Sequence, residues 1–203
     1  MRYNLTQGAV PAEPVTLAEA RLHLRIADDL TADDALITAL IQAAREWVEN
    51  HCRRSLVQRS LVLKMDYFPG CFKLPRGEVR SVTSVQYVDQ DGNTATVSSA
   101  DYQVDTASEP GRIVPQLGVV WPVPKFGAIN SVIVNYVAGY AEGAGSPSDY
   151  AANIPAAVKA AMKLIVGHLY EHRESIAPMA LFEVPMAVKS LLAPYEIRDF
   201  ELE

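Results

Sequence analysis

Hydrophobic and polar positions follow two different periods along the 203-residue chain. Near both ends, apolar residues recur every three or four positions, which is the period of an amphipathic helix. From Leu56 to about Tyr140 the pattern changes to alternation at every second position, as in strands. We therefore expect an α+β fold. Residues 1–56 and 141–203 would form a helical frame from both chain ends, and residues 57–140 an antiparallel, β-rich insertion between them.

The first part of the frame is predicted to hold two helices after a loose start that contains Pro11 and Pro14. Thr16–Glu19 has the capping-box pattern, in which a Thr hydroxyl and a Glu carboxylate satisfy free backbone donors, and it opens a short helix to about Ile26. The second helix is predicted from Asp33 to about Ser55. Its apolar stripe comprises Leu36, Ile37, Leu40, Ile41, Ala44, Trp47 and Val48. Arg45 and Glu49 are expected on the opposite side, where they can pair weakly.

The second part of the frame begins at Pro155, a residue that suits the first turn of a helix. The predicted helix runs to about Ser175, with a stripe made by Val158, Met162, Ile165, Leu169 and His172. A short helix over 186–192 follows and is stopped by Pro194. One-sided helices do not persist alone in water, so we expect the two long helices to pack against each other.

The middle segment is predicted to hold short antiparallel strands separated by turns and prolines. Asp89–Asn93 has the Asp-Gly composition of a turn, and Ala141–Ser148 that of a flexible connection. The expected strands cover residues 61–67, 82–88, 94–97, 102–104, 112–114 and 131–137.

Composition excludes several classes of protein. Apolar residues make up 49% and charged residues 21% of the chain, as in ordinary globular proteins. No apolar run reaches the 18 or so residues of a membrane span, and Met1–Gln7 lacks the core of a secretory signal, so a cytosolic origin is expected. The two cysteines, Cys52 and Cys71, provide neither a disulfide framework nor a zinc site.

The strongest enzymatic signal is His168-Leu169-Tyr170-Glu171-His172, which matches the H-x-x-E-H pattern of one metalloprotease class. Two histidines four apart share a helix face and could bind zinc, with Glu171 as general base. A third ligand is needed, and the candidates Glu174 and Glu183 have no supporting pattern. His172 also falls on the predicted apolar stripe, where packing explains it. A metal-dependent hydrolase therefore remains the alternative interpretation, and helix packing is preferred.

Other candidate sites for small ligands are weaker. Gly139–Gly145 follows a predicted strand but lacks the order of a phosphate-binding loop. Asp89–Asn93 lacks the later Glu of a calcium loop. We predict no catalytic residue, no metal and no cofactor.

Several residues are candidates for protein interfaces. Arg53 and Arg54 form a basic pair, which is explained either by a helix C-terminus or by contact with DNA phosphate or an acidic neighbour. Trp121 and Phe126 lie in a proline-rich loop, where aromatic residues either cap a sheet core or anchor an interface. The remaining candidates are Tyr195 and Phe200 near the C-terminus.

The net charge of −6, from 18 basic and 24 acidic residues, argues against tight binding to nucleic acid through phosphates. It is compatible with a protein that DNA passes without being held, because like charges leave the duplex free to slide. Residues 196–203 add four carboxylates against Arg198.

The order of the segments resembles that of the head–tail connector (adaptor) proteins of tailed bacteriophages. The resemblance rests on pieces spread over nearly the whole chain. These are Val15–Ala20 with His23–Ile26, Asp33–Glu49, Leu74–Gly77 with Val79–Val85, Asp101–Asp105, Trp121-Pro122, Tyr136–Tyr140, Ile154-Pro155, Gly167–Glu174 and Leu191–Tyr195.

This resemblance implies a structural protein and not an enzyme. Such proteins form a ring beneath the portal at the capsid vertex, extend the DNA channel and offer a surface to tail components. The implied partners are other copies of the chain, the portal protein, tail or stopper proteins, and double-stranded DNA that passes without specific binding. The implied location is the head–tail junction of a virion, after synthesis in the bacterial cytoplasm. A monomeric β-rich binding module remains a third possibility.

Overall fold

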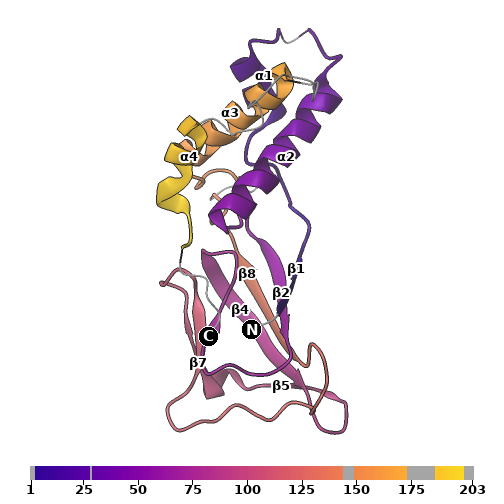
Figure 1. The fold of residues 1–203 in the computed structure, drawn as a ribbon, viewed down its shortest axis with the longest axis vertical. Helices are drawn as coiled ribbons and strands as arrows, with labels where there is room; N and C mark the ends of the chain where they lie inside the picture. Colours follow the sequence, from indigo (N-terminus) through magenta and orange to yellow (C-terminus); the bar gives the residue numbers. More distant parts are fainter. Residues whose placement is uncertain (1–2, 28, 144–148, 173–185, 199–203) are drawn as a thin grey trace. The chain divides into compact units, whose positions relative to one another are not determined.

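The computed structural model describes residues 3–27, 29–143, 149–172 and 186–198. The chain divides into two compact units (Figure 1). The β unit comprises residues 1–11, 58–139 and 197–203, and the helical unit comprises residues 12–57 and 140–196. Residues 1–11 thus group with the strands, although the pattern of the sequence placed them with the helices.

The helical unit is built from both halves of the frame expected from the sequence. It contains α1 (Leu17–Leu24), α2 (Asp34–Cys52), α3 (Ala156–Glu171), α4 (Met186–Leu192) and the short 3-10 helix η2 (Ala193–Tyr195). Helix α2 packs against α3, which also contacts α1 and α4. The expected pairing of the two long helices is therefore confirmed. Within the described residues, no helix combines the length and the apolar character needed to cross a membrane.

Local signals set the ends of the first two helices. The capping box of α1 is complete, since the Glu19 N–H donates to Thr16 Oγ1 at 3.2 Å and the Thr16 N–H donates to Glu19 Oε2 at 2.8 Å. Helix α1 ends at Arg25 and α2 at Arg53, both in the left-handed conformation, with φ of 58° and 56°. Because a left-handed residue cannot continue a right-handed helix, both helices end two or three residues before the predicted boundary.

The core of the helical unit takes side chains from α2, α3 and α4, together with the buried Ala20 of α1. Its fully buried members include Ile37, Ile41, Ala44 and Val48 of α2, Val158, Ala161 and Met162 of α3, and Val188 and Leu192 of α4. The predicted stripe of α3 is wrong at its C-terminal end. Leu169 is 37% exposed and His172 is exposed, so packing does not explain His172.

The placement of Arg45 and Glu49 on the solvent side of α2 was also wrong. Arg45 is 7% exposed and Glu49 is 3% exposed. Their burial is compensated by pairing, because Arg45 Nη1 lies 3.2 Å from Glu49 Oε2 and Arg45 Nε lies 2.9 Å from Glu13 Oε2. Glu49 Oε1 also accepts a 2.9 Å hydrogen bond from the Leu56 N–H. A helical wheel shows such a pair as polar and cannot show its partners.

The β unit contains a five-stranded antiparallel sheet with strand order β1-β2-β8-β4-β5. The strands are β1 (Tyr3–Gln7), β2 (Arg59–Met65), β8 (Val132–Ala138), β4 (Val79–Val88) and β5 (Thr94–Thr96). The predicted loose N-terminal start was wrong, since β1 pairs with β2 and places Leu5 opposite Leu63. This strand was missed because only Leu5 contributes an apolar side chain between polar neighbours.

A three-stranded sheet with order β3-β7-β6 completes the β unit. It comprises β3 (Phe72–Lys73), β7 (Arg112–Pro115) and β6 (Tyr102–Asp105), which follows the short 3-10 helix η1 (Ser99–Asp101). Side chains from both sheets form one core. Its members include Leu61, Leu63, Met65, Phe72, Val85, Ile113, Val134 and Tyr136. The buried Tyr136 hydroxyl donates a 2.8 Å hydrogen bond to the Pro75 carbonyl, which satisfies the polar end of the ring.

Candidate assembly surfaces

The basic pair Arg53-Arg54 separates into two different environments. Arg53 ends α2 with its side chain exposed, as expected for a cation at a helix C-terminus. Arg54 is 7% exposed, and its Nε donates a 2.5 Å hydrogen bond to the carbonyl oxygen of Tyr195. The structure thus brings together two predicted interface residues, Arg54 and Tyr195, in a contact that fixes η2 against the end of α2.

A second link between these segments involves Glu196, which follows η2. Its Oε1 lies 2.9 Å from His51 Nε2. Glu196 also lies close enough to affect Cys52, whose pKa is raised to about 11 chiefly by burial, then by the Glu196 carboxylate, with Arg54 acting in the opposite direction. These contacts hold the described end of the helical unit in place. Phe200, the last predicted interface residue, lies outside the described residues.

Trp121 and Phe126 lie in different environments although they share one loop. The Trp121 ring stacks on Phe68 at a centroid distance of 5.0 Å and meets the edge of Phe72 at 5.4 Å. Trp121 therefore covers one end of the β-unit core. Phe126 is 97% exposed. Of the two roles considered for aromatic residues in this loop, Trp121 has the core-capping one, and the interface role of Phe126 stays a prediction.

Phe126 belongs to a larger exposed set that the sequence analysis missed. Five apolar residues recur at every third position in the loop between β7 and β8. We call this set the apolar ridge: Leu117 (95% exposed), Val120 (87%), Val123 (76%), Phe126 (97%) and Ile129 (81%). The period of three is visible in the sequence, but it matches neither a helix nor a strand and was therefore overlooked.

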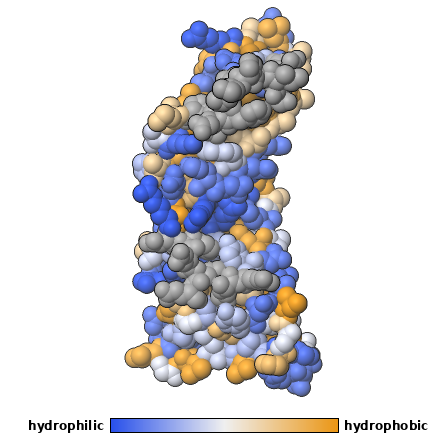
Figure 2. Space-filling model, in the orientation of Figure 1, coloured by the Kyte–Doolittle hydropathy of each residue, from blue (hydrophilic) through white to orange (hydrophobic). Residues whose placement is uncertain are grey.

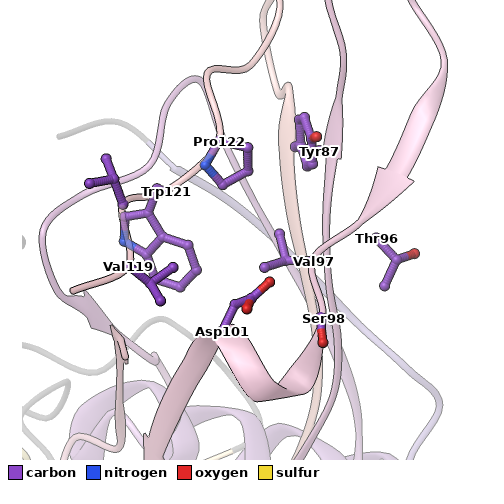
Figure 3. A pocket seen from close by; sticks show the side chains of 9 residues that line it. Tyr87, Thr96, Val97, Ser98, Asp101, Val119, Trp121 and Pro122 are labelled. Atoms are coloured by element: carbon purple, nitrogen blue, oxygen red, sulfur yellow. The ribbon is translucent and has the colours of Figure 1, made fainter. Parts of the chain in front are cut away.

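A pocket of about 350 Å³ lies beside the ridge within the β unit (Figure 3). Its walls come from three places in the chain: Tyr87 on β4, Thr96, Val97, Ser98 and Asp101 around β5 and η1, and Val119 to Pro122 in the loop. In Figure 3 the Trp121 ring and Val97 line the space, with the Asp101 carboxylate at its edge. The surface of the pocket is polar and apolar in about equal parts, and Asp101 is the one acidic residue in its lining.

The shifted pKa values among the described residues of the β unit have structural causes. Burial raises the pKa of Tyr102 and, far more strongly, that of Tyr136. Hydrogen bonds from Ser108, followed by one from Arg112, lower the pKa of Asp105 to about 2. All three shifts follow from packing or from a local turn.

The histidine motif lies at the end of α3. The His168 and His172 rings are 4.7 Å apart, and His172 Nδ1 lies 2.9 Å from the His168 carbonyl oxygen. Within the described ranges, no group of three or more His, Cys, Asp or Glu side chains could hold a metal ion. Glu174 and Glu183, the candidate third ligands, lie outside the described residues.

Solved structures with a similar fold include chains of gene transfer agent (GTA) particles. The neck of an empty GTA particle computed with C6 symmetry contains a chain 25% identical to this one, with a TM-score of 0.77, covering 100% of this chain and 99% of that chain. A chain in the virion of a native GTA particle is 23% identical, with a TM-score of 0.76 and 98% coverage of both chains. A chain in the neck of a native GTA particle computed with C12 symmetry is 23% identical, with a TM-score of 0.74, covering 100% of this chain and 99% of that chain.

Comparison with curated protein sequences gave no match. Comparison with protein families gave a match that agrees with the similar solved structures. Residues 14–109 match the family of phage gp6-like head-tail connector proteins. This range contains α1 and α2 of the helical unit and the strands β2 to β6 of the β unit. The resemblance of this chain to the head–tail connector proteins of tailed bacteriophages is thus confirmed by both family and fold.

Proposed function

We propose that this chain is a structural subunit of the head–tail connector, or adaptor, of a phage-like particle. Copies of it would form a ring beneath the portal, extend the DNA channel and offer an attachment surface to tail or stopper proteins. The observation that carries this proposal is the full-length likeness, at 25% identity, to a chain in the neck of a GTA particle computed with C6 symmetry. The match of residues 14–109 to connector proteins supports the same role.

The chemistry of the chain supports an interfacial role and not a catalytic one. A ring of identical subunits needs surfaces that bury apolar side chains between copies. The apolar ridge supplies five exposed side chains of this kind. The histidine motif, which carried the hydrolase alternative, has no third ligand among the described residues, so no observation favours that alternative.

The net charge of −6 suits a channel through which DNA must pass. A surface with the same sign of charge as the phosphate backbone repels DNA and therefore does not bind it. The carboxylates at residues 196–203 would add to this effect, although residues 199–203 lie outside the described residues. Assembly would take place after synthesis in the cytoplasm of the bacterial host, with the finished ring in the virion neck.

The test is assembly of the purified protein with its portal. Electron micrographs of portal rings mixed with the chain should show an additional ring layer at one end of the portal. The same portal rings without the chain are the control. A chain that leaves portal rings unchanged at every concentration tested would contradict the proposal.

A separate experiment tests the channel. Replacing Asp199, Glu201 and Glu203 by Lys, with Glu196 kept because it contacts His51, should slow DNA ejection from assembled particles and strengthen DNA retention. Unchanged retention and ejection would count against a role of these charges while leaving the ring itself intact.

A further inference from the structure

We propose that the ring contact between copies is made by Phe126 of one copy, which occupies the Trp121 pocket of the next. The Trp121 pocket is the cavity of Figure 3, whose lining includes Val120 of the ridge and the polar side chains of Thr96, Ser98 and Asp101. This inference rests on the proposed function, because it names the contact that would build the proposed ring.

The apolar ridge lies in a loop that carries little charge. Residues 116–130 contain a single charged residue, Lys125. Figure 2 shows several hydrophobic residues, separated by pale and hydrophilic ones, at the end of the β unit that carries the turn between β4 and β5. Five strongly exposed apolar side chains in one short loop make the ridge a candidate for contact with a partner.

The loop that carries the ridge is fixed before any partner binds. Its main chain is held at several points, by the Lys125 N–H donating to the Val88 carbonyl at 2.8 Å and the Gln116 N–H to the Asp101 carbonyl at 2.8 Å. The Gln90 side chain donates to the Pro124 carbonyl at 2.9 Å. The half-buried Trp121 side chain anchors the opposite side. A preorganised loop loses little conformational entropy on binding, which favours a specific contact.

The size of the pocket fits a phenyl ring. An apolar cavity of about 150 Å³ suffices to bind benzene, and the Trp121 pocket has about 350 Å³ with an open mouth. Phe126 is the largest side chain of the ridge and the most exposed. Phe126 does not occupy the pocket of its own chain, because the side chain is 97% exposed there.

Charge complementarity selects a second copy of this chain as the occupant. Lys125 precedes Phe126 directly in the sequence, and Asp101 lies at the edge of the pocket. A Phe126 ring that enters the neighbour's pocket brings an ammonium group towards that neighbour's carboxylate. In the proposed contact each copy inserts its Phe126 into the next copy and receives the Phe126 of the previous one. Such a contact is heterologous, and heterologous contacts generate closed rings when the rotation closes.

The first test compares two matched substitutions on the ridge, Phe126→Asp and Leu117→Asp. Both residues are at least 95% exposed in the single chain, so both variants should fold and melt like the wild type. Ring formation, on portal rings or at high protein concentration, is followed by mass photometry and electron microscopy. Phe126→Asp should require at least about tenfold more protein to form rings, as expected for loss of an interface anchor, and Leu117→Asp should have a much smaller effect.

A charge exchange supplies the second test. Lys125→Asp and Asp101→Lys should each weaken ring formation several-fold, and the double variant should recover most of the loss, since the pair is restored with its charges exchanged. Equal loss in Phe126→Asp and Leu117→Asp, or a double variant as weak as the sum of the single ones, would overturn this contact. If wild-type rings form and Phe126→Asp forms them equally well, this inference fails and the proposed function stands. If the wild type forms no ring with the portal, both fail.

Discussion

The guanidinium of Arg45 and the carboxylate of Glu49 lie 3.2 Å apart on the buried face of α2, although both residues have the sequence signature of a solvated pair. Glu49 also accepts the N–H of Leu56, the residue that leads from α2 towards the β unit's first long strand. The pair thus links α2 to the segment that follows the helix in the sequence. A charge that is buried with its partners in place is tolerated, and the same charge without them is costly.

This relationship predicts a strong and asymmetric effect of single substitutions. Glu49→Ala should lower the free energy of unfolding of the helical unit by about 2–3 kcal/mol, because it leaves Arg45 Nη1 and the Leu56 N–H without their buried acceptor, while Arg45 Nε keeps Glu13. Glu46→Ala is the matched control. Its carboxylate lies 3.6 Å from Arg45 with 67% of the side chain exposed, so the cost should stay below about 0.5 kcal/mol. Urea denaturation followed by circular dichroism measures both, and equal costs would show that burial of Glu49 is unimportant.

The aromatic cluster of the β unit gives a second prediction. Trp121→Ala should destabilise the β unit by about 2–3 kcal/mol, because it removes a ring that stacks on Phe68 and meets Phe72. Leu117→Ala in the same loop should change stability by less than about 0.5 kcal/mol, since the side chain is 95% exposed. Thermal unfolding of both variants decides the matter, and similar melting temperatures would contradict the role of Trp121 as a core cover.

The stability of the β unit should depend on pH through Asp105. Hydrogen bonds from Ser108, then from Arg112, lower the pKa of Asp105 from the usual 3.8 to about 2 in the folded chain. A depressed folded-state pKa stabilises the fold above the unfolded value, and the contribution is lost as the pH falls from about 3.8 towards 2. The difference in unfolding free energy between wild type and Asp105→Asn should therefore be constant above pH 5 or so and shrink on acidification. A difference that stays the same down to pH 2 would disprove the linkage.

The two cysteines should differ in reactivity. The thiolate is the nucleophile, and Cys52 is 1% exposed with its pKa raised to about 11, whereas Cys71 is exposed. A thiol reagent at pH 8 should modify Cys71 alone in the native protein and both residues after denaturation. Cys71→Ser should abolish the native reaction. Rapid labelling of Cys52 in that variant would show that the end of α2 opens readily.

Zinc should be absent in stoichiometric amounts from the purified protein. The described residues provide His168 and His172 close together but no third ligand beside them. Elemental analysis checks this directly, with His168→Ala as the control for any residual metal. One zinc per chain that disappears in the control would restore the hydrolase interpretation.

The periodic elements were predictable from the sequence because their signal is local. Helices α2 and α3 and the strands β2, β4 and β8 follow the apolar period, except at the C-terminal end of α3, where Leu169 and His172 are exposed. Strand β1 was not predictable in this way, since it is held by pairing with a strand more than fifty residues further along the chain. Burial of Arg45 and Glu49 depends in the same manner on Glu13 and Leu56, which a helical pattern does not include.

The candidate interface was partly predictable. Composition identified the loop with Trp121 and Phe126, but could not decide which aromatic residue faces the core. That choice depends on Phe68 and Phe72, which reach Trp121 only in the folded sheet. The sequence could not show that Arg53 and Arg54 lie in different environments, because Arg54 binds the carbonyl oxygen of Tyr195, which is 141 residues further along the chain.

The loop between β7 and β8 takes its shape largely from main-chain hydrogen bonds and from the few side chains that face inward. The outward-facing positions are therefore free to change during evolution without unfolding their support. A lineage of particles could alter the fit between neighbouring subunits, or acquire a new neighbour, by substitutions at every third residue of one short segment. The same arrangement gives protein engineers five positions for redesign on an otherwise constant scaffold.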